Sequence, residues 1–289
     1  MMAGTTLRPE TLLQGVGALG SLPTTWLAIR DTVERPGATT AEIAAAVSRD
    51  PDLVVRVLRM ANSAMYGLSR RVETIAQAVA LLGTRQMCDL ALACSVVERF
   101  QGVPAHLLDM GAFWRHAIAT AIASRSISAR RGEANPERMF AIGLLHDVGR
   151  LIFALRMPEV LAGCLDQVRT GEVLAGDAER AAFGFDHARM GEVLLETWRL
   201  PATMARAVGN HHAMLTGSGH AIESATVHVA DLVCHGLEYG PAGSAGALPA
   251  LVPAGWDLCG LGPKDLTGLA SEVDLAVDDI CAALMEPVT

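Results

Sequence analysis

Seven histidine and aspartate side chains of this chain lie in segments that are otherwise apolar and helical in pattern. On the buried face of such a helix, an imidazole or a carboxylate needs a partner that offsets the loss of its hydration. A backbone carbonyl could serve one such residue, whereas seven residues in five segments are more economically explained by a shared divalent cation. The candidate metal ligands are His116, His146, Asp147, His187, His211, His212 and Asp231.

The donor types narrow the choice of ion. Imidazole nitrogens and carboxylate oxygens without a thiolate favour Fe, Mn or Zn over Cu(I). Seven candidate ligands exceed the four of a tetrahedral zinc site, so two octahedral ions roughly 3.5–4 Å apart are the natural arrangement. Five neutral imidazoles and two carboxylates carry a charge of −2, which a single divalent ion would cancel. The sequence is therefore compatible with one ion or with two.

His146 and Asp147 are adjacent and close a predicted helix that begins at Asn135-Pro136. Neighbouring residues on a helix point about 100° apart, so both side chains can reach one ion only from the helix end. We expect Gly149 to let the chain bend there. Asp147, which has two oxygens, is the better candidate to bridge two ions.

Asp231 has a competing explanation. It lies three residues after His228 and four before His235, so on one helix it could pair locally with either histidine. The sequence leaves both options for Asp231, a metal ligand or half of a local pair.

Bulk composition disfavours several classes of protein. With 51% hydrophobic and 19% charged residues over 289 positions, the chain can form a compact core. The net charge of −8 disfavours nonspecific binding to nucleic acid, because phosphate backbones are held by basic surfaces. No apolar run is long enough for a membrane span, and no leader-like start is present. Six cysteines without a CxxC pair are typical of buried thiols in a reducing cytosol, so we expect a cytoplasmic protein.

Helical periodicity runs through nearly every segment, and none alternates like a strand, so the sequence predicts an all-α fold. Thr39 and Glu42 can form a capping box, and Asp50-Pro51 can begin the next helix. The helical pattern breaks at 101–104 and again over the Gly-, Pro- and Ala-rich stretch 240–263, which we interpret as a long loop.

These residues together resemble a known family. The order of His116, His146-Asp147 and Asp231 is similar to the HD superfamily of metal-dependent phosphohydrolases, and His187 with His211-His212 resembles the ligand set of its HD-GYP branch. The first third of the chain resembles the signature of HDOD domains. The motifs that carry this likeness are Asp50-Pro51, the run 58–64, Tyr66-Gly67, Leu82-Gly83, the run 143–147 and the run 198–201. The likeness covers about residues 10 to 237.

The resemblance implies an N-terminal helical subdomain, residues 1–103, that packs on an HD-like metal-binding bundle, residues 104–239. The loop 240–263 and a C-terminal helix over 264–289 complete the chain. It also implies a bacterial signalling module, commonly joined to receiver-type domains and regarded as a non-catalytic relative of the HD hydrolases.

Two departures from the HD-GYP pattern bear on activity. No Gly-Tyr-Pro loop follows His187, and the lysine expected three residues after Asp147 is Arg150. An arginine can clamp a phosphate in bidentate fashion but cannot give up a proton at ordinary pH.

Two hypotheses follow. The first is a non-catalytic regulator with a mono- or dinuclear site, which binds a signalling protein or a receiver-type domain. The alternative is a metal-dependent phosphohydrolase acting on a cyclic dinucleotide or nucleotide, with Asp147 and Arg150 as catalytic residues. We expect no specific nucleic acid and no membrane as partner. Four arginines of the signature region are expected to form a solvated face: Arg56, Arg59, Arg70 and Arg71.

Overall fold

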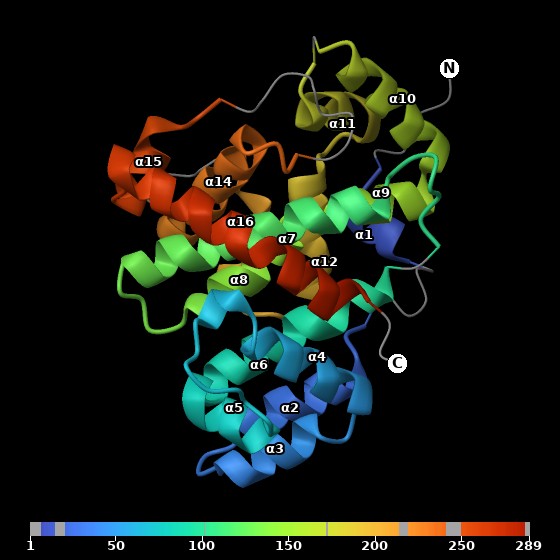
Figure 1. Cartoon of the computed structure of the whole chain (residues 1–289). Helices are drawn as coiled ribbons and strands as arrows, with labels where there is room; N and C mark the ends of the chain where they lie inside the picture. Colours follow the sequence, from blue (N-terminus) through green and yellow to red (C-terminus); the bar gives the residue numbers. More distant parts are fainter. Residues whose placement is uncertain are drawn as a thin grey trace.

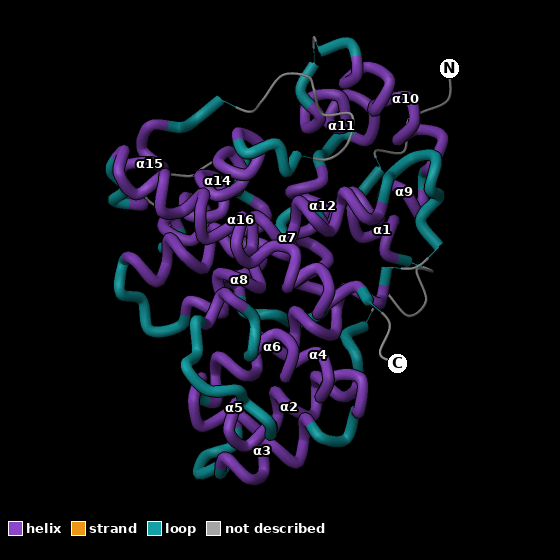
Figure 2. Tube along the Cα trace, in the orientation of Figure 1, coloured by secondary structure: helices purple, strands orange, loops and turns teal. Residues whose placement is uncertain are grey.

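The computed structural model describes residues 7–14, 21–100, 102–171, 173–213, 219–240 and 250–286. Within these ranges every regular element is a helix and no strand is present, as the tube view makes plain (Figure 2). The prediction of an all-α fold is confirmed.

The N-terminal lobe is a bundle of five α-helices, which lies at the bottom of Figure 1. Side-chain caps begin several of them: Thr39 and Glu42 form the predicted capping box, and Asp50 accepts a hydrogen bond from the backbone of Leu53. The helices are α2 (Thr24–Glu34), α3 (Thr40–Val47), α4 (Pro51–Ala61), α5 (Ile75–Leu82) and α6 (Thr84–Val96), with 3-10 turns η2 (Ala64–Tyr66) and η3 (Val97–Arg99).

The C-terminal lobe is built around the long helix α7 (Met110–Arg130), which packs against α8, α14 and α16. Small residues on α7 and α8 let the two helices approach closely; a Cβ at Gly143 would lie 2.8 Å from the backbone of Ala121. The other helices are α8 (Pro136–Leu145), α9 (Val148–Arg156), α10 (Pro158–Arg169), α11 (Ala175–Phe183), α12 (His187–Thr197), α13 (Ala202–Gly209), α14 (Ala221–Gly236), α15 (Pro253–Cys259) and α16 (Pro263–Met285).

The two ends of the described chain connect the lobes. Helix α1 (Pro9–Leu13) falls in the predicted N-terminal subdomain, yet it packs on α9 and α12 of the other lobe. Helix α16 runs along α7 and also contacts α4 and η2 (Figure 1). The apolar side chains of both lobes form one continuous core.

The prediction of a loop over residues 240–263 is partly wrong. Residues 241–249 lie outside the described residues, but α15 occupies 253–259 and packs on α14. Pro253 stands at the first helical position, and Gly255 and Cys259 are buried. The abundance of Gly and Pro indicates a loop, and for that reason the sequence did not reveal this helix. Proline is, however, also favoured as the first residue of a helix.

The segment from Asp50 to Val72, called the signature segment below, bonds to its own backbone. The Asn62 amide donates to the carbonyls of Leu58 and Val72 at 2.7 and 2.8 Å and accepts from the Val72 backbone N–H at 2.8 Å. Gly67 takes a left-handed conformation (φ +55°) that glycine adopts without strain. These bonds tie the turn after α4 to α4 itself.

One expectation for this segment is wrong. Arg56 is buried, with 4% of its surface exposed, whereas Arg70 and Arg71 are exposed as predicted and Arg59 is half-buried. Arg56 follows Leu53 by three residues and precedes Met60 by four, so it shares their buried face of α4.

Five of the six cysteines, all except Cys281, are buried, and all six are free thiols. This confirms the interpretation of the cysteines as small core residues. Among the described residues, no single helix has the length and apolar character needed to cross a membrane; the bent pair α5 and α6 reaches that threshold only when taken together.

Candidate metal centre

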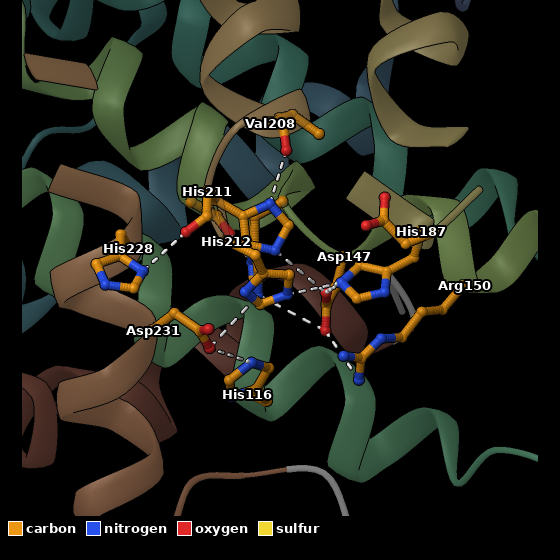
Figure 3. A network of polar contacts seen from close by, with 12 residues as sticks. His116, Asp147, Arg150, His187, Val208, His211, His212, His228 and Asp231 are labelled. Atoms are coloured by element: carbon orange, nitrogen blue, oxygen red, sulfur yellow. Dashed lines mark hydrogen bonds and ion pairs between the residues drawn. The ribbon is translucent and has the colours of Figure 1, made fainter. Parts of the chain in front are cut away.

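The structure brings the seven predicted side chains to one place inside the C-terminal lobe (Figure 3). His116 projects from the middle of α7, and His146 and Asp147 form the junction between α8 and α9. His187 is the first residue of α12. His211 and His212 lie in the turn after α13, and Asp231 lies on α14. Side chains from five separate parts of the chain therefore converge, as the sequence predicts.

One group of donors consists of Asp147, His187, His211 and His212, whose ligand atoms all lie within 4.8 Å of one another. The Nε2 atoms of His187 and His212 are 2.9 Å apart, and the His187 Nε2 is 3.1 Å from Asp147 Oδ1. Two donors that bind one ion at about 2.1 Å and at a right angle would be about 3.0 Å apart. The spacing of this group fits a single transition-metal ion.

A second group lies on the other side of Asp147 and contains His116, His146 and Asp147 itself. Asp231 Oδ1 joins it, at 3.2 Å from His116 Nε2 and 3.8 Å from His146 Nε2. Asp147 turns Oδ1 to the first group and lies with Oδ2 3.6 Å from His146 Nε2. Its two oxygens thus face two different sets of donors, which is the arrangement expected of a bridging ligand.

The histidine rings are oriented by backbone carbonyls. The Nδ1 atoms of His146 and His211 lie 2.7 and 2.6 Å from the carbonyls of Gly143 and Val208, and the Nδ1 of His116 lies 3.1 Å from that of Tyr239. A carbonyl can only accept, so each Nδ1 carries the proton and each Nε2 presents a lone pair. Such bonds to the outer nitrogen are typical of metal-binding histidines.

The inward-facing atoms have no hydrogen bond of acceptable geometry within the described part of the chain. These are Nε2 of His116, His146 and His211 and Oδ1 of Asp147 and Asp231. Buried polar atoms are normally paired, and several lone pairs that face one another repel. A cation among them would satisfy all of these atoms, so the donor set fits the metal ion that the sequence predicts.

His187 is held differently, through a carboxylate that the sequence analysis missed. Glu179 on α11 is buried, and its Oε2 accepts from the backbone N–H of His187 at 2.7 Å and from its Nδ1 at 2.5 Å. Burial and Arg150 lower the pKa of His187, but the carboxylates of Glu179 and Asp147 outweigh them and raise it to about 9. No helical spacing reveals Glu179, because a turn separates α11 from α12.

The other ionisation states suit metal binding. Burial lowers the pKa of His146 and lowers that of His211 to about 3, so both rings are neutral at pH 7. Burial also holds the pKa of His212 well below its usual value. Burial raises the pKa of Asp147, but Arg150 and the nearby histidines hold it well below its ordinary range. Neutral imidazoles and ionised carboxylates are the forms that bind metals.

Arg150 lies beside the shared carboxylate, where the sequence places it. Its Nη1 is 3.2 Å from Asp147 Oδ2, its Nε is 3.9 Å from Glu179 Oε1, and 18% of the side chain is exposed. The Arg150 side chain therefore lies beside the candidate ligand Asp147 and near Glu179, and it is partly exposed.

The competing explanation for Asp231 is partly correct. His235 Nε2 lies 3.4 Å from Asp231 Oδ1, so His235 belongs to the cluster, and it forms a further group with His116 and Asp231. His228 does not pair with Asp231: its Nδ1 lies 2.8 Å from the His211 carbonyl, and its Nε2 accepts from the backbone of Val252. Asp231 contacts both the local partner and the other candidate ligands.

The predicted role of Gly149 is wrong. The chain bends at His146-Asp147, and Gly149 lies inside α9. A Cβ at this position would collide with the His187 carbonyl and come within 2.8 Å of the Gly191 backbone nitrogen. The absent side chain lets α9 and α12 touch, which brings Asp147 and His187 within reach of each other.

The fold and the site define a class of protein: an all-helical protein with a buried centre of histidine and aspartate side chains. Residues 19–214 match the family model of the HDOD domain, so the chain belongs to the HDOD family. This match confirms the family that the signature motifs indicated.

The chain is also similar to solved structures and to one curated protein. An HDOD domain protein of unknown function from Geobacter sulfurreducens is 26% identical, with a TM-score of 0.76 and 96% of each chain covered. A protein from Shewanella amazonensis named as a candidate phosphohydrolase is 24% identical, with a TM-score of 0.73 over 97% of this chain and 100% of the other, and that likeness concerns the fold. An uncharacterised protein of Treponema pallidum is 24% identical over 72% of this chain, which spans only 40% of that relative.

Proposed function

We propose that this protein is a signal-transduction regulator of the HDOD family, in which a buried metal centre maintains the binding-competent form of the C-terminal lobe. The observation that carries the proposal is the set of inward-facing Nε2 and carboxylate atoms without hydrogen bonds around Asp147. Buried donors that are oriented but unpaired require a ligand of opposite charge.

The donors divide into two positions. Asp147, His187, His211 and His212 would hold one ion. His116, His146, Asp231 and the second oxygen of Asp147 would hold the other, with His235 beside it. Fe, Mn and Zn suit this mixture of nitrogen and oxygen donors. A chain that folds with only one ion would use the first group, because its donors are closest together.

A regulatory role follows from what the ligands connect. The donors come from α7, the junction of α8 and α9, α12, the turn after α13, and α14. Bound metal joins these elements, and binding free energy at such a site contributes directly to folding. Occupancy would thus set the rigidity of the lobe, and a signalling protein or receiver-type domain that recognises its surface would bind the loaded form.

The proposed regulator hydrolyses no substrate, and the reason lies in Arg150. A guanidinium keeps its proton at ordinary pH, so this residue cannot act as general acid for a leaving group. Its positive charge lies close to the carboxylates of Asp147 and Glu179, at 3.2 and 3.9 Å. It is better suited to neutralising the carboxylates of the centre than to proton transfer.

A second candidate is a phosphohydrolase that acts on a cyclic dinucleotide or nucleotide. The observation that favours it is the partial exposure of Arg150 beside the shared Asp147, where the guanidinium can contact a phosphate oxygen. A pair of divalent ions, when bound, supplies Lewis acidity suited to phosphoester hydrolysis. The name of the Shewanella protein agrees with this candidate but concerns that protein.

One experiment tests both candidates. Protein purified without oxygen is divided between elemental analysis and a turnover screen with nucleotides and cyclic dinucleotides in added Mn or Fe. The regulator predicts one to two bound ions per chain and no product. Steady release of a linear nucleotide, lost in His146→Ala and kept in the matched variant His106→Ala, would establish the hydrolase instead. His106 is an exposed histidine outside the cluster. Metal-free protein that takes up no added ion would contradict both.

A further inference from the structure

A cavity lies between the lobes, and none of the candidate metal ligands lines it. It has a volume of about 580 Å³, within the range of small-molecule sites. Its walls come from α2 and α6 of the N-terminal lobe, and from α8 and the turn between α12 and α13 of the C-terminal lobe. The apolar part is formed by four buried side chains: Trp26, Cys88, Leu200 and Met204. The indole N–H of Trp26 donates to the Cys88 carbonyl at 3.1 Å, and the Arg30 guanidinium lies over its ring, 5.3 Å from the ring centre.

Four arginines line this cavity, two from each lobe. Arg30 pairs with Asp31 at 2.9 Å, and Arg138 lies 3.6 Å from Asp89. Within the ranges that the structure describes, Arg85 and Arg199 form no ion pair with a carboxylate. Against these four arginines the lining holds only two acids, Glu34 and Asp89, so it is positively charged in a chain whose net charge is −8.

The backbone of Arg199 has a conformation that glycine usually adopts. Its φ is +56°, in the left-handed region that strains a residue with a Cβ. It follows the end of α12, where the Leu200 N–H donates to the Leu195 carbonyl at 3.0 Å. Helices commonly end in this way with glycine at the left-handed position. The turn gives no reason for an arginine at this position, and Arg199 lines the cavity.

We propose that this cavity binds a nucleoside phosphate as an effector. The phosphate would be held between Arg85 and Arg199, since guanidinium groups recognise phosphate through paired, charge-assisted hydrogen bonds. The base would lie against the wall that contains Arg30, stacked over Trp26, and Met204. The carboxylate of Asp89, fixed by a 2.6 Å hydrogen bond from Asn135, would accept an N–H of the base.

The position of the cavity explains why its occupant would act as an effector. A ligand that touches Arg85 and Arg199 bridges the two lobes and fixes their relative position. Met204 lies on α13, and the turn after that helix carries His211 and His212. The same short helix thus lines the cavity at one end and positions two candidate metal ligands at the other.

Calorimetric titration tests the proposal with AMP, GMP, cyclic AMP, cyclic di-GMP, inorganic phosphate and guanosine as probes. We expect one nucleotide to bind at one site per chain, and phosphate or guanosine alone to bind far more weakly. Arg199→Gly and Arg85→Ala should each weaken binding about tenfold or more, because each removes a charged hydrogen bond. Arg199→Gly should keep or raise the melting temperature, since glycine accepts the left-handed turn. Arg169→Ala, which removes an exposed arginine of α10, is the matched control and should change nothing.

The outcomes separate this site from the metal centre. Asp147→Ala, which removes the shared carboxylate, should still bind the nucleotide at one site per chain, because none of the candidate metal ligands lines the cavity. Binding that is lost in Asp147→Ala and kept in Arg199→Gly would place the nucleotide at the metal centre and overturn the proposal. Binding of none of the probes to the wild type would also overturn it, while the metal content would still test the proposed function independently.

Discussion

The signature segment of the N-terminal lobe and the histidine centre of the C-terminal lobe both concentrate polar side chains, but their bonding differs. In the signature segment, Asn62 and Asp50 each make hydrogen bonds to nearby backbone groups. In the histidine centre, the outer nitrogens are bonded to carbonyls while the inward-facing atoms are left without partners. The contrast lies between Asn62 and Asp50, whose polar atoms bond to the local backbone, and a centre in which several donor atoms face one another without hydrogen bonds.

The hydrogen bonds of a polar side chain distinguish a structural role from a functional one. A polar side chain whose hydrogen bonds close on the local backbone stabilises a turn, and its removal should cost folding free energy. A buried side chain that is oriented by one bond and open at the other end is arranged for a ligand.

The largest effect is expected from Asp147→Ala. Because Asp147 faces both groups of donors, its loss should weaken metal binding by about 100-fold or more at both positions. Elemental analysis after dialysis against a weak chelator measures this, with His106→Ala as control. Full metal content in Asp147→Ala, together with an unchanged circular dichroism spectrum, would remove Asp147 from the ligand set.

Glu179→Gln should have the next largest effect. The amide keeps the shape of the side chain but loses the charge that holds the proton on His187 Nδ1. Loss of such a carboxylate next to a metal-binding histidine typically costs 10–100-fold in affinity. Competition with a fluorescent chelator measures the change. The exposed variant Glu159→Gln on α10 serves as control, and equal affinity in both variants would show that Glu179 has no such role.

Asn62→Ala should destabilise the protein by about 1–3 kcal/mol and leave the metal content unchanged. The substitution removes three hydrogen bonds and leaves the Val72 N–H and carbonyl without their partner. Urea denaturation measures the free energy of unfolding. A variant that is fully stable, or one that stays folded but loses its metal, would break the distinction between the two regions.

A smaller effect should appear with pH. In metal-free protein the pKa of His187 is raised to about 9, chiefly because Glu179 outweighs burial, so below pH 9 its Nε2 carries a proton that a metal must displace. His146 and His211, whose pKa values are lowered, are already neutral at pH 7 and release none. Metal affinity should therefore rise by about tenfold per pH unit between pH 7 and 8 and level off above 9.

Calorimetry in buffers of different ionisation enthalpy measures the protons released on metal binding. About one proton should leave at pH 7.5, and His187→Ala should abolish this release. Release of no proton from the wild type would contradict the assignment of His187 as a protonated ligand.

Much of the fold was predictable because local signals agree with the tertiary structure. The caps at Thr39, Asp50 and Asn135 begin helices as their sequences indicate. The convergence of histidines was predictable for the same reason, since polar residues on apolar faces must meet a partner inside. The features that were missed depend on contacts between distant segments.

Three residues illustrate this limit. Glu179 meets His187 only because α11 folds back against α12, and no periodicity records that contact. Gly149 is explained by the backbone of another helix, whereas its sequence context suggested a bend. Arg56 is charged and was assigned to solvent, but its position on α4 places it on the buried face.

The most direct test of the metal centre is anomalous X-ray scattering from a crystal of protein loaded anaerobically with Mn or Fe. The account predicts two peaks on either side of Asp147, one near the Nε2 atoms of His187, His211 and His212 and one near those of His116 and His146. No anomalous peak in a crystal where these rings keep their present positions, with water or other side chains bonded to the inward-facing atoms, would contradict it.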